Sequence, residues 1–382
     1  MLKSKEFYKD KKVIVRVDYN VPINNGIIED NNRIICSLKT INYLIDSNAK
    51  VILMSHLGKI KSEEDKINNS LEVVSFELSK LLGKNVKFCK STRGAELENM
   101  VNTLKPGEVM LMENTRHEDY PNNLESSCDK ELSNYWASLG DEYVMDAFGS
   151  IHRNHASTFG IASVLGGTTG FLVDEELSHL NEVMNDNNKI IILGGAKVSD
   201  KLGVIENLVN NSKKILLGGG MCFTFLRSLN KNIGNSILDN EKIEYCRELL
   251  SKYNDKIVLP LDIVTENGNK GIDNINDDEI GYDIGVNTIN LYKSLISKED
   301  LVVWNGPMGK FEDDNYENGT RELLEYLNSN SIKTIICGGD TGSATKKYNL
   351  SFYYTSTGGG ASLEYLEGKK FDILEVLNKW KK

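Results

Sequence analysis

Cationic side chains follow several strand-like segments in the first half of the sequence. Apolar runs at 12–17, 50–55, 108–112 and 142–147 lead into "DYNVP", "SHLGK", "ENTRH" and "DAFGSIHRNH". Because ligands of open α/β sheets bind beyond the carboxyl ends of the strands, the groups after these runs could converge on one small phosphate or carboxylate. Any one of these groups, taken alone, is explained as a solvated surface charge, because arginine and lysine are ordinarily exposed. Their recurrence at strand ends favours a shared site. With the nearby "DNNRI", the groups are Arg33, His56, Lys59, Arg116, His152 and Arg153.

Glycine turns follow the strand-like segments of the second half instead. They are "LGGAKVSDK" (193–201), "LGGGM" (217–221), "WNGPMG" (304–309) and "CGGDTGS" (337–343). A single turn of this kind is explained equally well by a tight connection from strand to helix. Their repetition, with Lys197, Lys201 and the carboxylate of Asp340, indicates a nucleotide phosphate chain with Mg²⁺, which takes one or two carboxylates plus phosphate oxygens. The lysines are four residues apart, which predicts that both project from one face of a helix's first turns.

The stretch "STGGGASLEYLEG", residues 356–368, places three glycines before a short amphipathic segment. Ser356 or Thr357 is expected to cap this helix, and Gly358, Gly359 and Gly360 leave its free N–H groups open to an anion. A flexible linker before a C-terminal helix is the alternative.

Two common phosphate-binding fingerprints are missing from the sequence. It contains no G-x-x-x-x-G-K-[ST] and no G-x-G-x-x-G, so a P-loop and the usual dinucleotide site are unsupported. A lysine pair with glycine turns indicates phosphoryl transfer on another scaffold, since that chemistry needs mainly alignment and charge neutralisation.

The elements that would position these groups alternate between strand and helix along the chain. Short β-branched runs such as 189–195, 213–220, 256–260, 300–306 and 333–340 alternate with helix-period segments such as "SLEVVSFELSKLLG" and "GTRELLEYLN". This alternation predicts parallel sheets of the doubly wound α/β kind. At 382 residues, two domains are expected. The segment 166–185 is either an interdomain helix without a preceding strand or an ordinary crossover helix.

Composition excludes several classes of protein. A formal net charge of −10 argues against nucleic-acid binding, which requires a broad basic face. No apolar run approaches the roughly 20 residues needed to span a bilayer, and the first residues lack an apolar signal core. The six cysteines form no C-x-x-C pair, so neither a zinc site nor a disulfide framework is indicated. We therefore expect a cytoplasmic protein without nucleic-acid or membrane partners.

The motifs together resemble the phosphoglycerate kinase family from end to end. The matching blocks include "VRVDYNVP", "SHLGK", "GGAKVSDK", "WNGPMGKFE", "GGDTGS" and "STGGGAS". The resemblance implies two Rossmann-like domains, a monomer, and hinge closure that aligns the two ligands. The domains would be 1–168 for phosphoglycerate, with segment 363–382 packing back on it, an interdomain helix at 169–185, and 186–362 for nucleotide. The implied reaction passes a phosphoryl group between 1,3-bisphosphoglycerate and MgADP, giving 3-phosphoglycerate and MgATP.

The resemblance also implies roles for particular residues. Phosphoglycerate would be bound by Asp18, Tyr19, Asn20, Arg33, His56, Leu57, Gly58, Lys59, Arg116 and Arg153. Nucleotide would be bound by Lys197, Lys201, Gly281, Glu312, Gly338, Gly339, Asp340 and Thr341, with Glu312 at the ribose and Asp340 at Mg²⁺. We assign the stabilisation of the moving phosphoryl group to Arg33, Lys201 and the helix start at Gly358, Gly359 and Gly360. Lys197 would lie beside the nucleotide phosphates.

Departures from the family pattern leave other hypotheses to weigh. Lys59 stands where the family usually has arginine, and a point charge there replaces a bidentate fork. A noncatalytic nucleotide-binding protein is one alternative, against which the retention of Arg33, Lys197, Lys201 and Asp340 argues. An oxidoreductase is another, and it would need a ribose-binding acid after a G-x-G-x-x-G turn that is absent.

Overall fold

The computed structural model describes residues 1–379 and divides the chain into two compact units. The first comprises residues 1–177 with the chain end from Lys370, and the second comprises 178–369. The boundary falls within helix α8 (Phe171–Asn185), where the sequence analysis placed an interdomain helix. The two-residue strand β8 (Thr168–Thr169) precedes α8 directly, so the expectation of a helix without a preceding strand is wrong.

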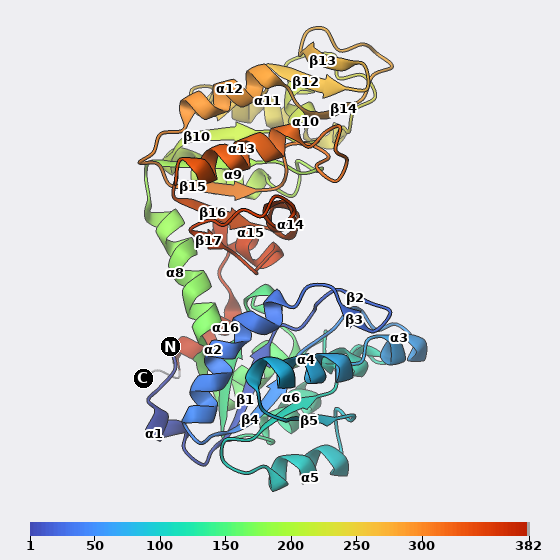
Figure 1. The fold of residues 1–382 in the computed structure, drawn as a ribbon, viewed down its shortest axis with the longest axis vertical. Helices are drawn as coiled ribbons and strands as arrows, with labels where there is room; N and C mark the ends of the chain where they lie inside the picture. Colours follow the sequence, from blue (N-terminus) through green and yellow to red (C-terminus); the bar gives the residue numbers. More distant parts are fainter. Residues whose placement is uncertain (380–382) are drawn as a thin grey trace. The chain divides into compact units, whose positions relative to one another are not determined.

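The first unit is built on a sheet whose paired neighbours are all parallel (Figure 1). Its order is β5 (Val86–Cys89), β6 (Val109–Met112), β4 (Lys50–Met54), β1 (Lys12–Val17), β7 (Glu142–Asp146) and β8. The helices are α1 (Lys5–Tyr8), α2 (Asn32–Asp46), α3 (Glu63–Asn68), α4 (Glu72–Leu82), α5 (Ala95–Thr103), α6 (Lys130–Ala137), α7 (Ile161–Leu165) and α16 (Asp372–Lys379). Short elements complete the unit: hairpin β2 (Ile23–Asn24) and β3 (Ile27–Ile28), η1 (Thr115–Asp119), η2 (Phe148–Ser150) and η3 (Ala156–Gly160).

The second unit has a six-stranded sheet of the same kind and a smaller antiparallel one. The parallel order is β11 (Ile257–Val258), β10 (Ser212–Leu217), β9 (Lys189–Leu193), β15 (Val302–Asn305), β16 (Thr334–Cys337) and β17 (Tyr354–Thr355). The antiparallel order is β13 (Gly268–Gly271), β12 (Asp262–Thr265) and β14 (Gly281–Ile284). The helical elements are α9 (Leu202–Leu208), η4 (Val209–Asn211), α10 (Cys222–Ser228), η5 (Asn240–Lys242), α11 (Ile243–Lys252), α12 (Val286–Leu295), α13 (Asn318–Ser329), α14 (Gly339–Lys347) and α15 (Gly360–Leu366).

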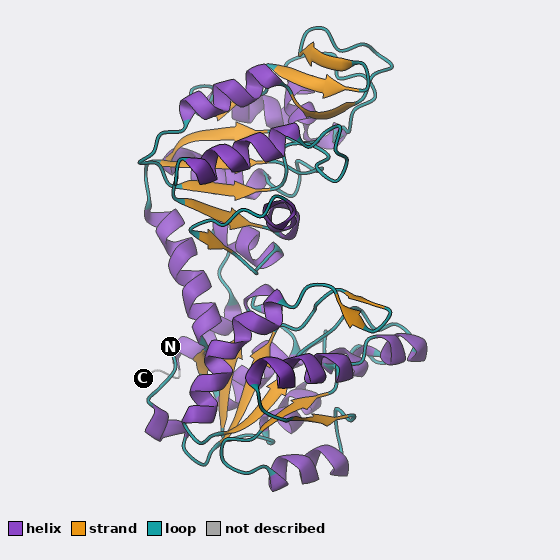
Figure 2. Cartoon of the chain, in the orientation of Figure 1, coloured by secondary structure: helices purple, strands orange, loops and turns teal. Residues whose placement is uncertain are grey.

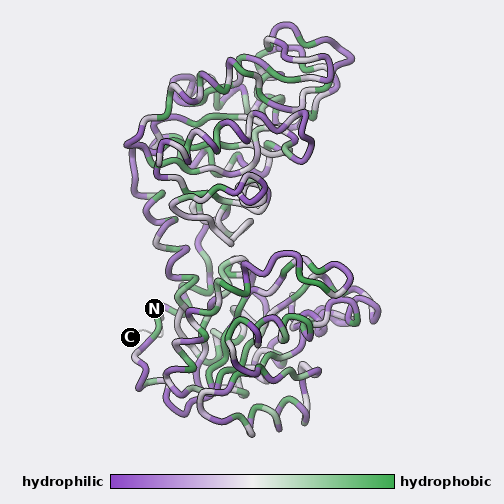
Figure 3. The backbone as a smooth tube through the Cα atoms, viewed as in Figure 1, coloured by the Kyte–Doolittle hydropathy of each residue, from purple (hydrophilic) through white to green (hydrophobic). Residues whose placement is uncertain are grey.

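The apolar runs become strands because their side chains are buried on both faces of a sheet. Every residue of β1 from Val13 to Val17 is buried, and so is every residue of β9. In each unit the helices lie on both sides of the strands (Figure 2), and the hydrophobic stretches concentrate on the strands and on inward helix faces (Figure 3). The predicted doubly wound α/β class with parallel sheets is confirmed.

The end of the chain is divided between the units at residue 370. Helix α15 contacts α9, and residues 363–369 belong to the second unit, whereas the sequence analysis placed the segment from 363 with the first. Helix α16 contacts α7 and η3 in the first unit, with Ile373 and Leu377 buried. Residues 380–382 of the predicted segment lie outside the described residues.

Candidate functional site

The predicted cations of the first unit lie at the carboxyl ends of neighbouring strands. His56 and Lys59 follow β4, Arg116 follows β6, and His152 and Arg153 follow β7; with β1, these strands are neighbours in the sheet. Arg33 comes instead from the first turn of α2. Its Nη1 donates to both carboxylate oxygens of Asp18 at 3.2 Å and to the carbonyl of Asn20 at 3.1 Å. The Asn20 side chain accepts from the Gly58 amide at 2.9 Å, which ties the loop after β1 to the loop after β4.

Arg33 keeps part of its guanidinium available for a ligand. Its Nε and Nη2 make no hydrogen bond or ion pair within residues 1–379, and 33% of the side chain is exposed. The backbone amide of Arg116 donates a hydrogen bond to the Asn114 side chain. The buried Nε of Arg116 has no partner in the described part of the chain. A buried N–H donor without a partner is costly unless a ligand satisfies it. Lys59 is exposed.

Two predicted contacts are placed differently from the rest. The side chains of Tyr19 and Leu57 are buried in the hydrophobic core of the first unit. The Tyr19 hydroxyl bonds to Ser37 at 3.0 Å, and burial raises its pKa. The Tyr19 amide donates to Ser55 Oγ at 2.8 Å, and the Leu57 amide donates to Asn114 Oδ1 at 3.1 Å. These two residues therefore support the loops that carry the site and do not themselves present free groups to a ligand.

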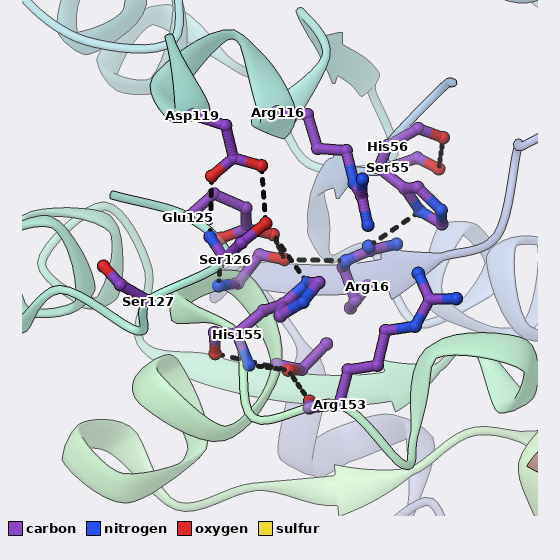
Figure 4. A network of polar contacts seen from close by, with 12 residues as sticks. Arg16, Ser55, His56, Arg116, Asp119, Glu125, Ser126, Ser127, Arg153 and His155 are labelled. Atoms are coloured by element: carbon purple, nitrogen blue, oxygen red, sulfur yellow. Dashed lines mark hydrogen bonds and ion pairs between the residues drawn. The ribbon is translucent and has the colours of Figure 1, made fainter. Parts of the chain in front are cut away.

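A polar network under this surface was missed by the sequence analysis (Figure 4). Arg16, fully buried in β1, places Nη2 3.1 Å from Nδ1 of His56 and donates from Nε to Ser157 at 2.8 Å. Burial lowers the pKa of His56 well below its ordinary value, and the charges of Arg16, Arg116 and Arg153 lower it further. An arginine inside the apolar run "VIVRV" was the available signal, since strands buried on both faces rarely carry a charge.

The glycine turns of the second unit enclose a cavity of about 440 Å³. Predicted residues that line it are Lys197, Lys201, Gly338, Gly339, Asp340, Thr341, Gly359 and Gly360. A neighbouring cavity of about 500 Å³ shares Gly195, Ala196 and Asp340 with the first. It is also lined by the predicted residues Gly281 and Glu312, and by Ile237, Ile280 and Tyr282.

Lys201 is the buried cation of the first cavity. It is 8% exposed, and its ammonium donates to Oδ1 of Asn305 at the end of β15. Burial lowers the pKa of Lys201, and the nearby Asp200 and Asp340 oppose that effect. Nδ2 of Asn305 is buried without a partner in the described residues, and Asn305 also lines the cavity. The sequence analysis gave Asn305 no role, although it stands in the "WNGPMG" turn.

The local structure of two motifs differs from the prediction. Helix α9 begins at Leu202 with Lys201 as its N-cap, so Lys197 lies in an irregular turn and the lysine pair does not share a helix face. Both still reach the cavity. Helix α15 is capped by Gly359 at φ +51°, a conformation that glycine adopts without strain. Ser356 accepts from the Gly358 amide at 3.1 Å and does not cap the helix.

The fold and these groups define a class of protein. The chain has two doubly wound α/β units. One carries clustered cations, and the other has a glycine-lined cavity with a buried lysine. This combination is typical of a phosphotransferase that acts on small molecules. A family model described as phosphoglycerate kinase matches residues 4–369. The chain belongs to the phosphoglycerate kinase family, whose reaction has a carboxyl group as acceptor.

Named relatives and solved structures agree with this membership. A phosphoglycerate kinase of Fusobacterium nucleatum is 50% identical over 385 residues, covering 97% of each chain, and one of Listeria monocytogenes EGD-e is 50% identical over 375 residues, covering 95% of each. The structure of phosphoglycerate kinase from Coxiella burnetii matches with TM-score 0.86, 33% identity and 98% of each chain covered. That from Pyrococcus horikoshii OT3 matches with TM-score 0.85, 29% identity and coverage of 99% and 98%. The predicted family is confirmed, and the oxidoreductase hypothesis finds no support.

Proposed function

We propose that the first unit binds phosphoglycerate and the second binds the magnesium nucleotide, for reversible phosphoryl transfer between 1,3-bisphosphoglycerate and MgADP. The observation that carries the assignment is the buried Lys201 ammonium in a glycine-lined cavity beside Asp340. A cation held out of water stabilises phosphoryl charge far more than a solvated one. We place the phosphoglycerate domain at 1–168 and the nucleotide domain at 186–362.

The phosphoglycerate ligand offers a phosphate and a carboxylate to the first unit. Arg33 has two free donor nitrogens, and Arg116 has a buried Nε that needs an acceptor. His56, kept neutral by burial and by neighbouring cations, is a hydrogen-bond donor or acceptor at neutral pH and no charge partner. No general base is required, because the attacking carboxylate or ADP oxygen is already ionised. The histidines therefore orient the ligand.

The nucleotide would lie along the two neighbouring cavities of the second unit, which share Gly195, Ala196 and Asp340. Lys197, Lys201 and the Gly338–Gly339 turn suit its phosphates, since backbone N–H groups at glycine turns can approach phosphate oxygens closely. Gly281, Tyr282 and Ile237 suit the base, and Glu312 the ribose. Lys201 would also act on the moving group, together with Arg33 and the backbone at Gly359.

Magnesium would reach this site with the nucleotide. Asp340 is exposed on the first turn of α14 and lines both cavities. A single carboxylate fits an ion that is held mainly by phosphate oxygens and water. Within residues 1–379 no cluster of three or more histidine, cysteine or acidic residues could hold a metal by itself. When bound, the ion would neutralise phosphate charge, and Asp340 would help to hold it.

We further propose a cytoplasmic, monomeric enzyme without nucleic-acid or membrane partners. Among residues 1–379 the structure has no helix with the length and apolar character of a bilayer-spanning segment.

Titration calorimetry with each ligand separately tests the division of labour. Arg116→Ala should weaken 3-phosphoglycerate binding about 10- to 100-fold, the usual loss for a hydrogen bond to a charged group, and leave MgADP binding intact. Asp340→Asn should do the opposite and abolish the magnesium dependence. Arg93→Ala is the matched control, because Arg93 is paired with Glu118 outside the predicted site. Equal weakening of both ligands by either site variant would contradict the proposal.

A further inference from the structure

The buried arginine of β1 has no assigned role in the site above it. Arg16 is 0% exposed, and its guanidinium is directed at three acceptors. These are Ser157 Oγ at 2.8 Å, the Val17 carbonyl at 2.5 Å and Nδ1 of His56 at 3.1 Å. Figure 4 shows Arg16 below the His56 ring, with Arg116 and Arg153 on either side. The contact between Arg16 and His56 joins a core residue to a residue of the predicted phosphoglycerate site.

Hydrogen-bond chemistry fixes the state of His56. A guanidinium has donors and no acceptor, and it stays protonated in proteins. Nδ1 of His56 must therefore accept from Arg16 Nη2, so it carries no proton. A neutral imidazole then carries its proton on Nε2. That Nε2–H makes no hydrogen bond within the described residues, so it remains available to an incoming ligand.

The charge of Arg16 is balanced within the core. Ser157 accepts from Arg16 and donates its own hydroxyl proton to Oε1 of Glu125 at 2.5 Å, while its amide donates to Oε2 at 2.9 Å. Glu125 is 0% exposed. Replacing such a buried charge pair by apolar residues is often neutral or stabilising, so stability alone does not explain it. A function in the site above the network explains why these charges are buried there.

We infer that Arg16 is a positioning residue, which holds His56 as a neutral Nε2–H donor for phosphoglycerate. The inference rests on the proposed function in one respect, namely that His56 contacts that ligand. Without Arg16 the ring is free to adopt the other tautomer. It would then present a lone pair to an anionic ligand and repel it.

The tautomer can be measured in the free protein without any activity assay. The chain has five histidines, so long-range ¹H–¹⁵N spectra of histidine-labelled protein give a small set of signals. His56→Gln identifies the His56 ring by its missing signals. The inference expects a neutral ring protonated at Nε2 at neutral pH. A ring protonated at Nδ1, or a doubly protonated ring, would overturn it whatever the enzyme's activity.

Variants connect the tautomer to ligand binding. Arg16→Met combined with Glu125→Gln removes both buried charges together, which avoids leaving either charge unpaired. In this double variant the Nδ1–H form of His56 should appear beside the Nε2–H form, and the KM for 3-phosphoglycerate should rise about 10- to 100-fold, with the KM for ATP unchanged. Glu125→Gln alone keeps the contact between Arg16 and His56 and should keep the tautomer.

The outcomes separate the inference from the proposed function. An unchanged tautomer in the double variant would refute the role of Arg16. A changed tautomer with an unchanged KM for 3-phosphoglycerate would show that His56 is not the donor and would refute the inference at that step. If the wild type neither bound nor turned over 3-phosphoglycerate, the proposed function would fail, and the tautomer result would still stand.

Discussion

Replacing Lys201 by alanine separates a role in catalysis from a role in folding. Its ammonium is 8% exposed and donates to the neutral side chain of Asn305. Burial lowers the pKa of Lys201, which means that the folded protein disfavours its charged form. A charge kept at such a cost in the lining of a cavity is expected to act on a ligand. We therefore expect Lys201→Ala to lower activity and not stability.

The size of the effect follows from the burial of Lys201. An ammonium about 4 Å from a phosphoryl oxygen interacts by about 4 kcal/mol at an effective dielectric constant of about 20. Removing one preorganised donor from a site of developing charge usually lowers kcat about 100- to 1,000-fold. We expect a loss in this range, with a much smaller change in the KM for ATP, because the interaction is strongest in the transition state.

The assay is steady-state kinetics with ATP and 3-phosphoglycerate varied in turn, alongside urea unfolding. Lys189→Met is the matched control. Lys189 is also a fully buried lysine whose pKa burial lowers, but its ammonium donates to the carbonyls of Asp186 and Asn211, away from the cavity. Its loss leaves those carbonyls unpaired and should cost about 1–3 kcal/mol of stability, with kcat unchanged. An unaltered kcat in Lys201→Ala, or a loss explained by unfolding, would refute the catalytic role.

Three further predictions concern single residues. Lys59→Arg should lower the KM for 3-phosphoglycerate, because a fork replaces a point charge; an unchanged KM would show that this position does not limit binding. Asn305→Ala removes a buried donor that faces the cavity and should weaken ATP binding about 10- to 100-fold in titration calorimetry, and unaltered affinity would exclude that contact. Burial raises the pKa of Asp146 to about 7. The folded state therefore holds a proton that the unfolded chain releases near pH 4, so the contribution of Asp146 to the free energy of unfolding should fall as pH rises from about 4 to 7. Asp146→Asn should flatten this fall, measured by urea titrations at several pH values. The pKa of Asp283 is also raised to about 7, but its contribution is the same in both proteins. An identical pH profile for the variant would show that Asp146 does not hold the proton.

Sequence reasoning succeeded where local chemistry decides the outcome. The β-branched runs at 12–17 and 189–195 became buried parallel strands because a strand covered on both faces needs continuous apolar side chains. Residues that follow the parallel strands of one sheet lie at the same edge of that sheet. For this reason the cations of the first unit, and separately the glycine turns of the second, could be grouped from the sequence.

Sequence reasoning failed where polar strands or tertiary contacts determine the structure. The antiparallel sheet of β12, β13 and β14 was missed because β13, "GNKG", is polar and exposed or half-buried. The Asn267–Gly268 pair, where the turn after β12 enters β13, was the hairpin signal. The four-residue spacing of Lys197 and Lys201 predicted a helix, but spacing alone cannot show that the glycine turn delays the helix to Leu202. The roles of Arg16 and Asn305 depend on neighbours distant in sequence, at His56 and Lys201.

The most direct test supplies the purified protein with ATP, Mg²⁺ and 3-phosphoglycerate and couples acyl phosphate formation to NADH oxidation by glyceraldehyde-3-phosphate dehydrogenase. Magnesium-dependent turnover that disappears when either substrate is omitted is the predicted result. A protein that binds both ligands in calorimetry and yet forms no acyl phosphate would contradict the proposed phosphoryl transfer.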